Sequence, residues 1–227
     1  LAGGENRVEW TVRVPRPPLW WPAELGDQPL HDVELAVATE DGLASDAVVR
    51  RIGFRSVSMR DHVWSVNGER LFLRGAVVPP LDADLVRVTA ESAANDLASA
   101  WAAGLNLLRV IGHVSSPHLY DEADRTGMLL WQDAPLTGGY HRGVRSQAAR
   151  QAREMVDLLG HHPSIVVWCG HDAPDPVDKT RAAPRLLDQQ QPTWNRTVLD
   201  RTVRRALEQA DPSRPVISHS GVLPNLP

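Results

Sequence analysis

The sequence predicts a chain of two parts: part of an immunoglobulin-like antiparallel β-sandwich, followed by part of a (β/α)8 TIM barrel. Three observations lead to this prediction. Over residues 1–57 apolar and polar residues alternate, the pattern of strands with one buried face. After residue 70, short unbroken apolar runs alternate with helical stripes, as in parallel strands joined by crossover helices. The 227 residues, 42% hydrophobic and 23% charged, are typical of a globular chain of one or two domains.

The first part is predicted to contain three or four antiparallel strands. Alternation predicts strands at residues 8–14, 30–38 and within 43–57, with Asp41 and Gly42 forming a turn. Prolines at positions 15, 17, 18 and 22 exclude a helix in the intervening linker. A short hairpin follows, in which Asn67-Gly68 is the signal of a two-residue type I′ turn. We therefore assign residues 1–57 to the C-terminal strands of a sandwich domain.

The second part, residues 58–227, is predicted to hold the first five strands and four helices of a barrel domain. The apolar runs predict parallel strands at residues 71–73, 107–111, 128–131, 165–169 and 216–218. Helical stripes between them begin at Ala94, Pro117, Ala148 and Trp194, and Gly104 and Gly127 stop the first two.

Both predicted units are incomplete. A (β/α)8 barrel needs eight strands and about 250 residues, and an immunoglobulin-like sandwich needs about seven strands. We therefore expect the chain to be a fragment of a longer protein, with the remaining polypeptide or a partner chain completing the barrel. A doubly wound five-stranded sheet is the alternative, but no glycine-rich phosphate loop follows the first strand, where residues 74–78 read Arg-Gly-Ala-Val-Val.

Charge and composition exclude several function classes. A net charge of −4 and a pI of 6.1, without a basic stripe, argue against nucleic acid as a partner. Neither an apolar run of membrane-spanning length nor a secretory leader is present, and Cys169 alone cannot form an internal disulfide. We expect no membrane contact and a cytoplasmic location. His161, His162, His171 and Asp172 lack the spacing of a metal site, so no metal or other cofactor is expected.

Motifs that follow one another along the chain carry a family resemblance. They are Arg-Ile-Gly-Phe-Arg at 51–55, Leu-Arg-Gly-Ala at 73–76, Trp-Gln-Asp at 131–133, His-Pro-Ser-Ile at 162–165 and Trp-Cys-Gly at 168–170. Their order resembles glycoside hydrolase family 2, which includes β-mannosidases, β-galactosidases and β-glucuronidases. The resemblance implies a glycosidase of carbohydrate metabolism that cleaves β-linked sugars with retention. Such enzymes use one glutamate as acid and base and a second as nucleophile.

The chain departs from this family pattern at the catalytic positions. Asp172 and Ala173 occupy the positions of an Asn-Glu pair whose glutamate is the acid/base residue. Alanine has no proton to give, and general acid catalysis is worth about 10²- to 10⁴-fold in rate. Val77 and Gly112 stand where the family places an Asn and a His, with His113 displaced by one position. The nucleophile is expected near a seventh strand, beyond residue 227.

These departures favour a degenerate, non-catalytic or carbohydrate-binding family member, a pseudoenzyme. The alternative is an active retaining exo-β-glycosidase, of β-galactosidase or β-mannosidase type, whose nucleophile lies beyond residue 227. A scaffold without a sugar site is the third interpretation. No catalytic residue is assigned, although Asp172 lies next to the degenerate position Ala173.

A β-linked sugar or glycoside is the expected ligand. The resemblance implies the substrate-binding candidates Arg109, His113, Trp131, Asp133, Trp168, His171 and Asp172. Tryptophan faces stack on apolar sugar surfaces, and the arginine can donate hydrogen bonds to hydroxyls. Each candidate also has a structural interpretation: the tryptophans can fill the core, and Arg109 can pair with a neighbouring aspartate.

Overall fold

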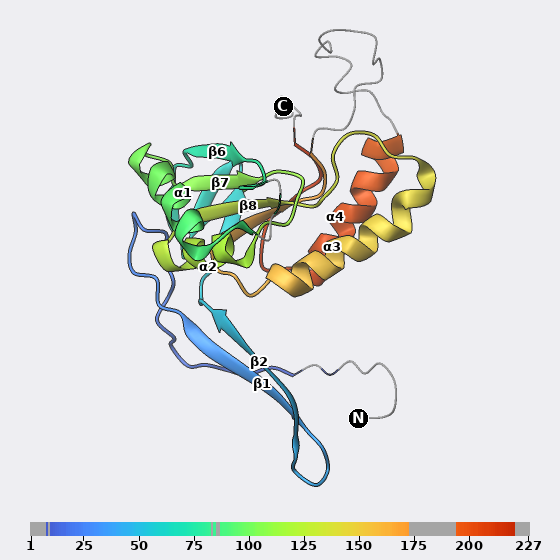
Figure 1. The fold of residues 1–227 in the computed structure, drawn as a ribbon. Helices are drawn as coiled ribbons and strands as arrows, with labels where there is room; N and C mark the ends of the chain where they lie inside the picture. Colours follow the sequence, from blue (N-terminus) through green and yellow to red (C-terminus); the bar gives the residue numbers. More distant parts are fainter. Residues whose placement is uncertain (1–7, 9, 83, 85–86, 173–193, 221–227) are drawn as a thin grey trace.

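The computed structural model describes residues 8, 10–82, 84, 87–172 and 194–220, and a five-stranded parallel sheet lies at its centre (Figure 1). The strands lie side by side in sequence order, β6 to β10. Their bounds are β6 (Gly75–Val78), β7 (Leu107–Val110), β8 (Leu129–Asp133), β9 (Ile165–Cys169) and β10 (Val216–Ile217). This confirms the predicted sequential order. Closure into a barrel and the domain boundary at residue 57 stay predictions.

Helices alternate with these strands as predicted. They are α1 (Ala90–Ala102), α2 (Pro117–Thr126), α3 (Arg145–Leu159) and α4 (Asp200–Ala210), with a 3₁₀ turn (Arg142–Val144) before α3 and a π turn (Asn195–Leu199) before α4. Thr89 begins α1 with a capping box to Ser92, and Gly127 ends α2 in the left-handed conformation, at φ 75°. The predicted stop signals therefore act where the sequence places them.

The parallel sheet has a different core on each face. The helices cover one face, where Leu97, Leu119, Met155 and Leu207 pack with Leu130 of β8. The opposite face carries Leu107, Leu129 and Val167, which pack with Trp20 and with side chains of the antiparallel strands. Hydrophobic burial on both faces accounts for the unbroken apolar runs of these strands.

The antiparallel strands form two small sheets. β1 (His31–Ala38) pairs with β2 (Ala44–Ile52) in a ribbon that projects away from the parallel sheet (Figure 1). β3 (Val57–Arg60), β4 (Val63–Val66) and β5 (Glu69–Leu71) form the second sheet. Asn67 and Gly68, between β4 and β5, have φ values of 52° and 89°, which confirms the predicted hairpin turn.

Two strand predictions are wrong. Residues 8 and 10–14 form no strand: no described segment pairs with them, and Val12 is 72% exposed. A strand is stable only where its backbone groups find a partner. The apolar run at 71–73 is not the first parallel strand, because β5 ends at Leu71 and β6 begins at Gly75. Phe72 is 77% exposed whereas Leu71 and Leu73 pack inward, so this segment has one buried face instead of two.

The Arg-Ile-Gly-Phe-Arg motif joins the antiparallel strands to the parallel sheet. Arg55 donates to the carbonyl oxygens of Pro163 and Ile165, at 2.9 and 2.7 Å. Burial lowers the pKa of Arg55 to about 9. A Cβ atom on Gly53 would lie 2.8 Å from the Pro163 ring and 2.9 Å from Trp20, so only glycine fits without a shift. No described helix is long and apolar enough to cross a membrane.

Candidate functional site

An ion-pair cluster centred on Arg109 lies at the carboxyl ends of the parallel strands. Arg109 of β7 donates from Nε to both carboxylate oxygens of Asp133, at 3.1 Å, and from Nη2 to Oδ2 at 2.5 Å. Nη2 also lies 2.8 Å from Oδ1 of Asp172, which follows β9. Three predicted candidates therefore meet at one edge of the sheet, the edge at which barrel enzymes place their chemistry.

Arg109 attracts both carboxylates of this cluster, whereas the two carboxylates repel each other. Burial acts against the charge of Arg109, but hydrogen bonding and attraction to Asp133 prevail and raise the pKa of the guanidinium. Burial raises the pKa of Asp133 above its usual range, and the contacts with Arg109 oppose that rise. Trp131 Nε1 also donates to Oδ1 of Asp133, at 2.9 Å. Every donor around Asp133 therefore favours the carboxylate over the acid.

Solvent reaches only part of the cluster. The side chain of Asp133 is 0% exposed, whereas those of Arg109 and Asp172 are 18% and 23% exposed. The guanidinium carbon of Arg109 lies 5.5 Å from the centre of the partly buried Trp131 ring. A ligand at this edge would therefore contact Arg109, Asp172 and Trp131, whereas the buried Asp133 would hold Arg109 and Trp131 in place.

His113 lies in the loop after β7. Its Nδ1 is 2.9 Å from the carbonyl oxygen of Ile111, and its backbone oxygen accepts from Nε2 of Gln132, at 2.7 Å. Nε2 of His113 is buried and has no hydrogen-bond partner among the described residues. Since the carbonyl of Ile111 only accepts, Nδ1 carries a proton.

Trp168 lies on the helix-covered face of the sheet, away from Arg109. It is 0% exposed, its Nε1 donates to Asp211 at 2.8 Å, and the Arg214 guanidinium lies 5.4 Å from its ring centre. His171 is also 0% exposed, with Asp200 at Nδ1 and the carbonyl of Gly138 at Nε2. This burial argues against direct sugar contact by either residue.

The departures from the family pattern have partial structural explanations. Gly112 has φ 63°, and a Cβ atom there would lie 2.4 Å from Cγ2 of Thr137. A histidine at position 112 therefore does not fit this loop. Val77 pairs in register with Arg109 and is 52% exposed, so it adds an apolar surface beside the cation. Ala173 lies outside the described residues.

Ser220 is a member of the cluster that the sequence analysis missed. Its Oγ accepts from Nη2 of Arg109 at 2.6 Å and donates to Oδ1 of Asp172 at 3.0 Å. It follows β10 by three residues, and its position at the end of a predicted strand was the available signal. Cys169 is buried, and burial raises the pKa of its thiol to about 12, as expected for an unreactive core cysteine.

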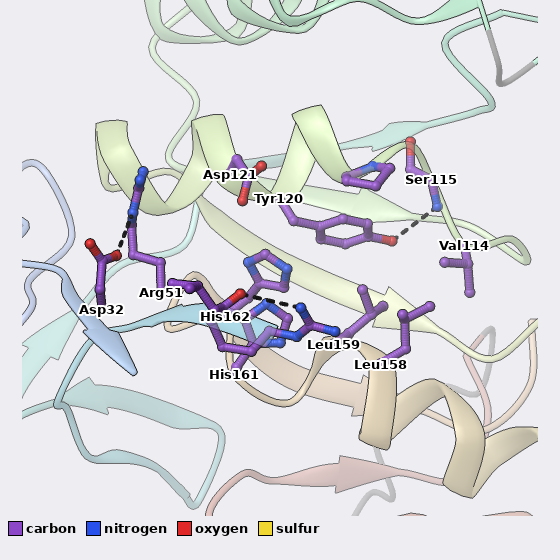
Figure 2. Close-up of a pocket in the computed structure, with 13 residues that line it drawn as sticks. Asp32, Arg51, Val114, Ser115, Tyr120, Asp121, Leu158, Leu159, His161 and His162 are labelled. Atoms are coloured by element: carbon purple, nitrogen blue, oxygen red, sulfur yellow. Dashed lines mark hydrogen bonds and ion pairs between the residues drawn. The ribbon is translucent and has the colours of Figure 1, made fainter. Parts of the chain in front are cut away.

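A pocket away from the cluster is lined by residues of α2, of the C-terminal end of α3 with the loop that follows it, and of β1 and β2. Figure 2 shows His161 and His162 side by side on its floor, with Tyr120 of α2 opposite Leu158 and Leu159 of α3. Its volume is about 460 Å³. It contains none of the predicted sugar-binding candidates. No group of histidine, cysteine and carboxylate side chains among the described residues is arranged to hold a metal ion.

Comparisons with known proteins agree with the motif pattern. The family model described as glycosyl hydrolases family 2 matches residues 2–55. A β-mannosidase A from Aspergillus terreus is 32% identical over 177 residues, which cover 68% of this chain and 19% of the relative. The chain thus spans about a fifth of that relative's length.

Solved structures of similar proteins extend the likeness over most of the chain. The β-D-mannosidase from Dictyoglomus thermophilum matches with a TM-score of 0.72 and 25% identity, covering 90% of this chain and 26% of the other. The exo-chitosanase from Amycolatopsis orientalis matches with a TM-score of 0.71 and 25% identity, covering 93% of this chain and 24% of the other.

Proposed function

Because the chain belongs to glycosyl hydrolase family 2, we propose that it supplies the glycoside-binding edge of a (β/α)8 barrel that binds β-linked mannosides without hydrolysing them. The observation that carries this proposal is the Arg109 cluster, in which Asp133 and Asp172 are both bound to one guanidinium. The antiparallel strands before residue 58 belong, in this proposal, to an immunoglobulin-like sandwich that packs beside the barrel.

Both described aspartates of this cluster are bound to Arg109, which argues against general acid catalysis by either of them. A general acid must hold a proton within hydrogen-bond reach of the leaving oxygen. Asp133 is wholly buried and accepts from Arg109 and Trp131, so it lacks access to that oxygen. Asp172 accepts from Arg109 and Ser220 through the same oxygen, Oδ1. The alanine at position 173 offers no proton.

The same cluster supports sugar binding. Nη1 of Arg109 has no hydrogen-bond partner among the described residues, although the guanidinium is held in place through Nε and Nη2. A preorganised donor costs little entropy when a hydroxyl binds it. Asp172 can accept a second hydroxyl, and the Trp131 ring can stack against the apolar face of a pyranose.

The mannoside configuration is proposed from the relatives. The Aspergillus terreus protein and the Dictyoglomus thermophilum structure are both β-mannosidases by name. The Trp-Gln-Asp motif at 131–133, which supplies the Trp131 and Asp133 side chains of the cluster, also favours the mannosidase type.

Titration of tryptophan fluorescence with mannose, galactose and glucuronate tests the binding. We expect mannose to quench the signal saturably with a Kd of about 1 mM, equivalent to about 4 kcal/mol, and the other two sugars to bind more weakly. Arg109→Lys serves as the loss-of-binding variant, because lysine keeps the charge but not the fork of donors. No saturable signal with any of the three sugars would exclude the binding proposal.

An assay of hydrolysis of alkyl and aryl β-mannosides by the full-length protein tests the proposed lack of hydrolytic activity. We expect the rate of the buffer alone for the wild type. Turnover by the wild type at about 1 to 10³ per second, the ordinary enzyme range, would instead establish the active exo-β-glycosidase. Ala173→Glu is the matched variant: a gain of rate in that variant alone shows that the missing acid is what prevents turnover.

A further inference from the structure

A buried cluster of two histidines and one aspartate lies directly behind the Arg109 site. Asp200, the first residue of α4, is 2.8 Å through Oδ1 from Nδ1 of His171 and 2.9 Å through Oδ2 from Nδ1 of His219. The side chains of Asp200 and His171 are 0% exposed, and that of His219 is 17% exposed. One helix-borne carboxylate therefore contacts the two segments that follow β9 and β10.

Both ring nitrogens of His171 have a hydrogen-bond partner. Its Nε2 is 2.8 Å from the carbonyl oxygen of Gly138, which can only accept, so Nε2 carries a proton. Its Nδ1 faces Oδ1 of Asp200, at 2.8 Å. Burial opposes the charge of Asp200, but the hydrogen bond with His171 and the close approach of His219 outweigh it and lower the pKa of Asp200.

The His171 ring has neighbours on several sides. The Tyr140 ring lies 5.8 Å from that of His171, on the loop that also supplies Gly138. The charges of Arg196 and Asp200 attract each other on the helical segment that leads into α4. Among the described residues, the charged group that is hydrogen-bonded to His171 is Asp200.

The cluster is connected to the Arg109 site through adjacent residues. His171 precedes Asp172, and His219 precedes Ser220. The two segments are also bound to each other, because the backbone N–H of Ser220 donates to the carbonyl oxygen of His171, at 3.0 Å. Asp172 and Ser220 are the two residues that bind Arg109 beside Asp133. A shift of either histidine would therefore also move a hydrogen-bond partner of Arg109.

We propose that Asp200 is a positioning residue that holds His171 and His219, and through them places Asp172 and Ser220 against Arg109. Within the part of the chain that the structure describes, Asp200 forms no hydrogen bond or ion pair with Arg109, so it acts through its histidine partners. The consequence for sugar affinity rests on the proposed mannoside site, whereas the consequence for Arg109 itself does not.

The test compares the full chain with Asp200→Asn, which keeps the shape of the side chain and removes its charge. In ¹⁵N NMR at pH 7, we expect the ring nitrogen signals of His171 to shift between the wild type and the variant, because Nδ1 loses its carboxylate partner. We expect the guanidinium protons of Arg109 to exchange with water at least five-fold faster in the variant. The Kd for mannose should rise about ten-fold, equivalent to about 1.4 kcal/mol.

Asp211→Asn is the matched control. Asp211 is a largely buried aspartate that binds Trp168 and Arg214 on the helix side of the sheet, without contact to the Arg109 cluster. We expect this control to lose stability but to leave the His171 ring nitrogen signals, Arg109 exchange and mannose affinity unchanged. His219→Gln, at a partly exposed position, provides the same comparison with Asp200→Asn should that variant not fold.

The outcomes separate the two proposals. Unchanged Arg109 exchange in a folded Asp200→Asn or His219→Gln protein would overturn the positioning role. Equal effects of Asp211→Asn would overturn it as well. Faster Arg109 exchange in a protein that binds no sugar would support the positioning role and refute the mannoside site.

Discussion

Replacing Arg109 by methionine should destabilise the protein strongly at neutral pH. Methionine matches much of the length of arginine but carries no charge and no donor. Asp133 would then be a carboxylate with 0% exposure whose remaining described donor is Trp131 Nε1. Breaking a buried pair by removing one partner costs about 3–5 kcal/mol, because the remaining charge is uncompensated. We expect a loss of that size in the free energy of unfolding at pH 7.

The pH dependence of this loss identifies its cause. Without Arg109, burial favours the neutral acid, so the pKa of Asp133 in the folded variant should exceed its value in the unfolded chain. Folding then takes up a proton, and the variant recovers stability relative to the wild type as the pH falls from 7 towards 5.

Urea unfolding of four proteins measures this effect: wild type, Arg109→Met, Asp133→Asn and the double variant. Asparagine removes the buried charge, so the double variant should be more stable than Arg109→Met at pH 7. Arg109→Met within about 1 kcal/mol of wild type at pH 7 would contradict the argument, because that is the range of an exposed ion pair. A deficit that is the same at pH 5 and pH 7 would also contradict it.

Two further predictions concern stability away from the cluster. Burial lowers the pKa of His161 to about 4, and the charges of His162 and Arg50 add to this effect. As the pH falls from 6.5 to 4, the unfolded chain takes up the proton before the folded protein does. The free energy of unfolding of the wild type should therefore decrease by at most about 3 kcal/mol over this range. His161→Gln should lack this loss when urea unfolding is measured at pH 7 and 4.5. The same pH dependence of stability in the variant and the wild type would refute the lowered pKa of His161. Gly127→Ala should lower the thermal stability clearly more than Gly104→Ala. Both glycines have positive φ, but a Cβ on Gly127 would lie 2.5 Å from the backbone nitrogen of Ala23, whereas Gly104 faces open space. Equal losses would show that backbone strain alone, without the contact, sets the cost.

The parallel half of the fold was predictable because its signals are local and agree with one another. Pro117 at the start of α2 and Gly127 at its end are capping signals that act within one turn of the helix. The apolar runs of β7, β8 and β9 are long enough to mark strands buried on both faces.

The first half was less predictable because its strands depend on partners distant in the sequence. Alternation at residues 8–14 matches that of β1 as a pattern. Within the part of the chain that the structure describes, β1 has a neighbouring strand, β2, and residues 8 and 10–14 have none. The same limit applies to Ser220, which reaches Arg109 across 111 residues. Periodicity shows which residues share a face, but not which segments meet.

The position of Trp168 shows how a single backbone irregularity decides which face of the sheet a side chain joins. Leu130 pairs with Ile165, but the next residue, Trp131, pairs with Val167, so β9 accommodates one extra residue at this point. Such a bulge exchanges the two faces for every residue that follows it, because side chains alternate along a strand. Ile165 and Trp168 therefore both join the core under the helices.

The same irregularity determines what faces the Arg109 cluster. Cys169 pairs in register with Asp133, and the charges of Asp133 and Arg109 both affect the pKa of its thiol. In a regular strand, alternation from Ile165 would turn Trp168 towards the cluster and Cys169 towards the helices. The bulge gives the cluster a small side chain beneath Asp133 and leaves the Trp131 ring as the described aromatic surface beside Arg109. No feature of the sequence Ile-Val-Val-Trp-Cys marks the extra residue. The aromatic surface beside Arg109 could therefore not be predicted from the sequence.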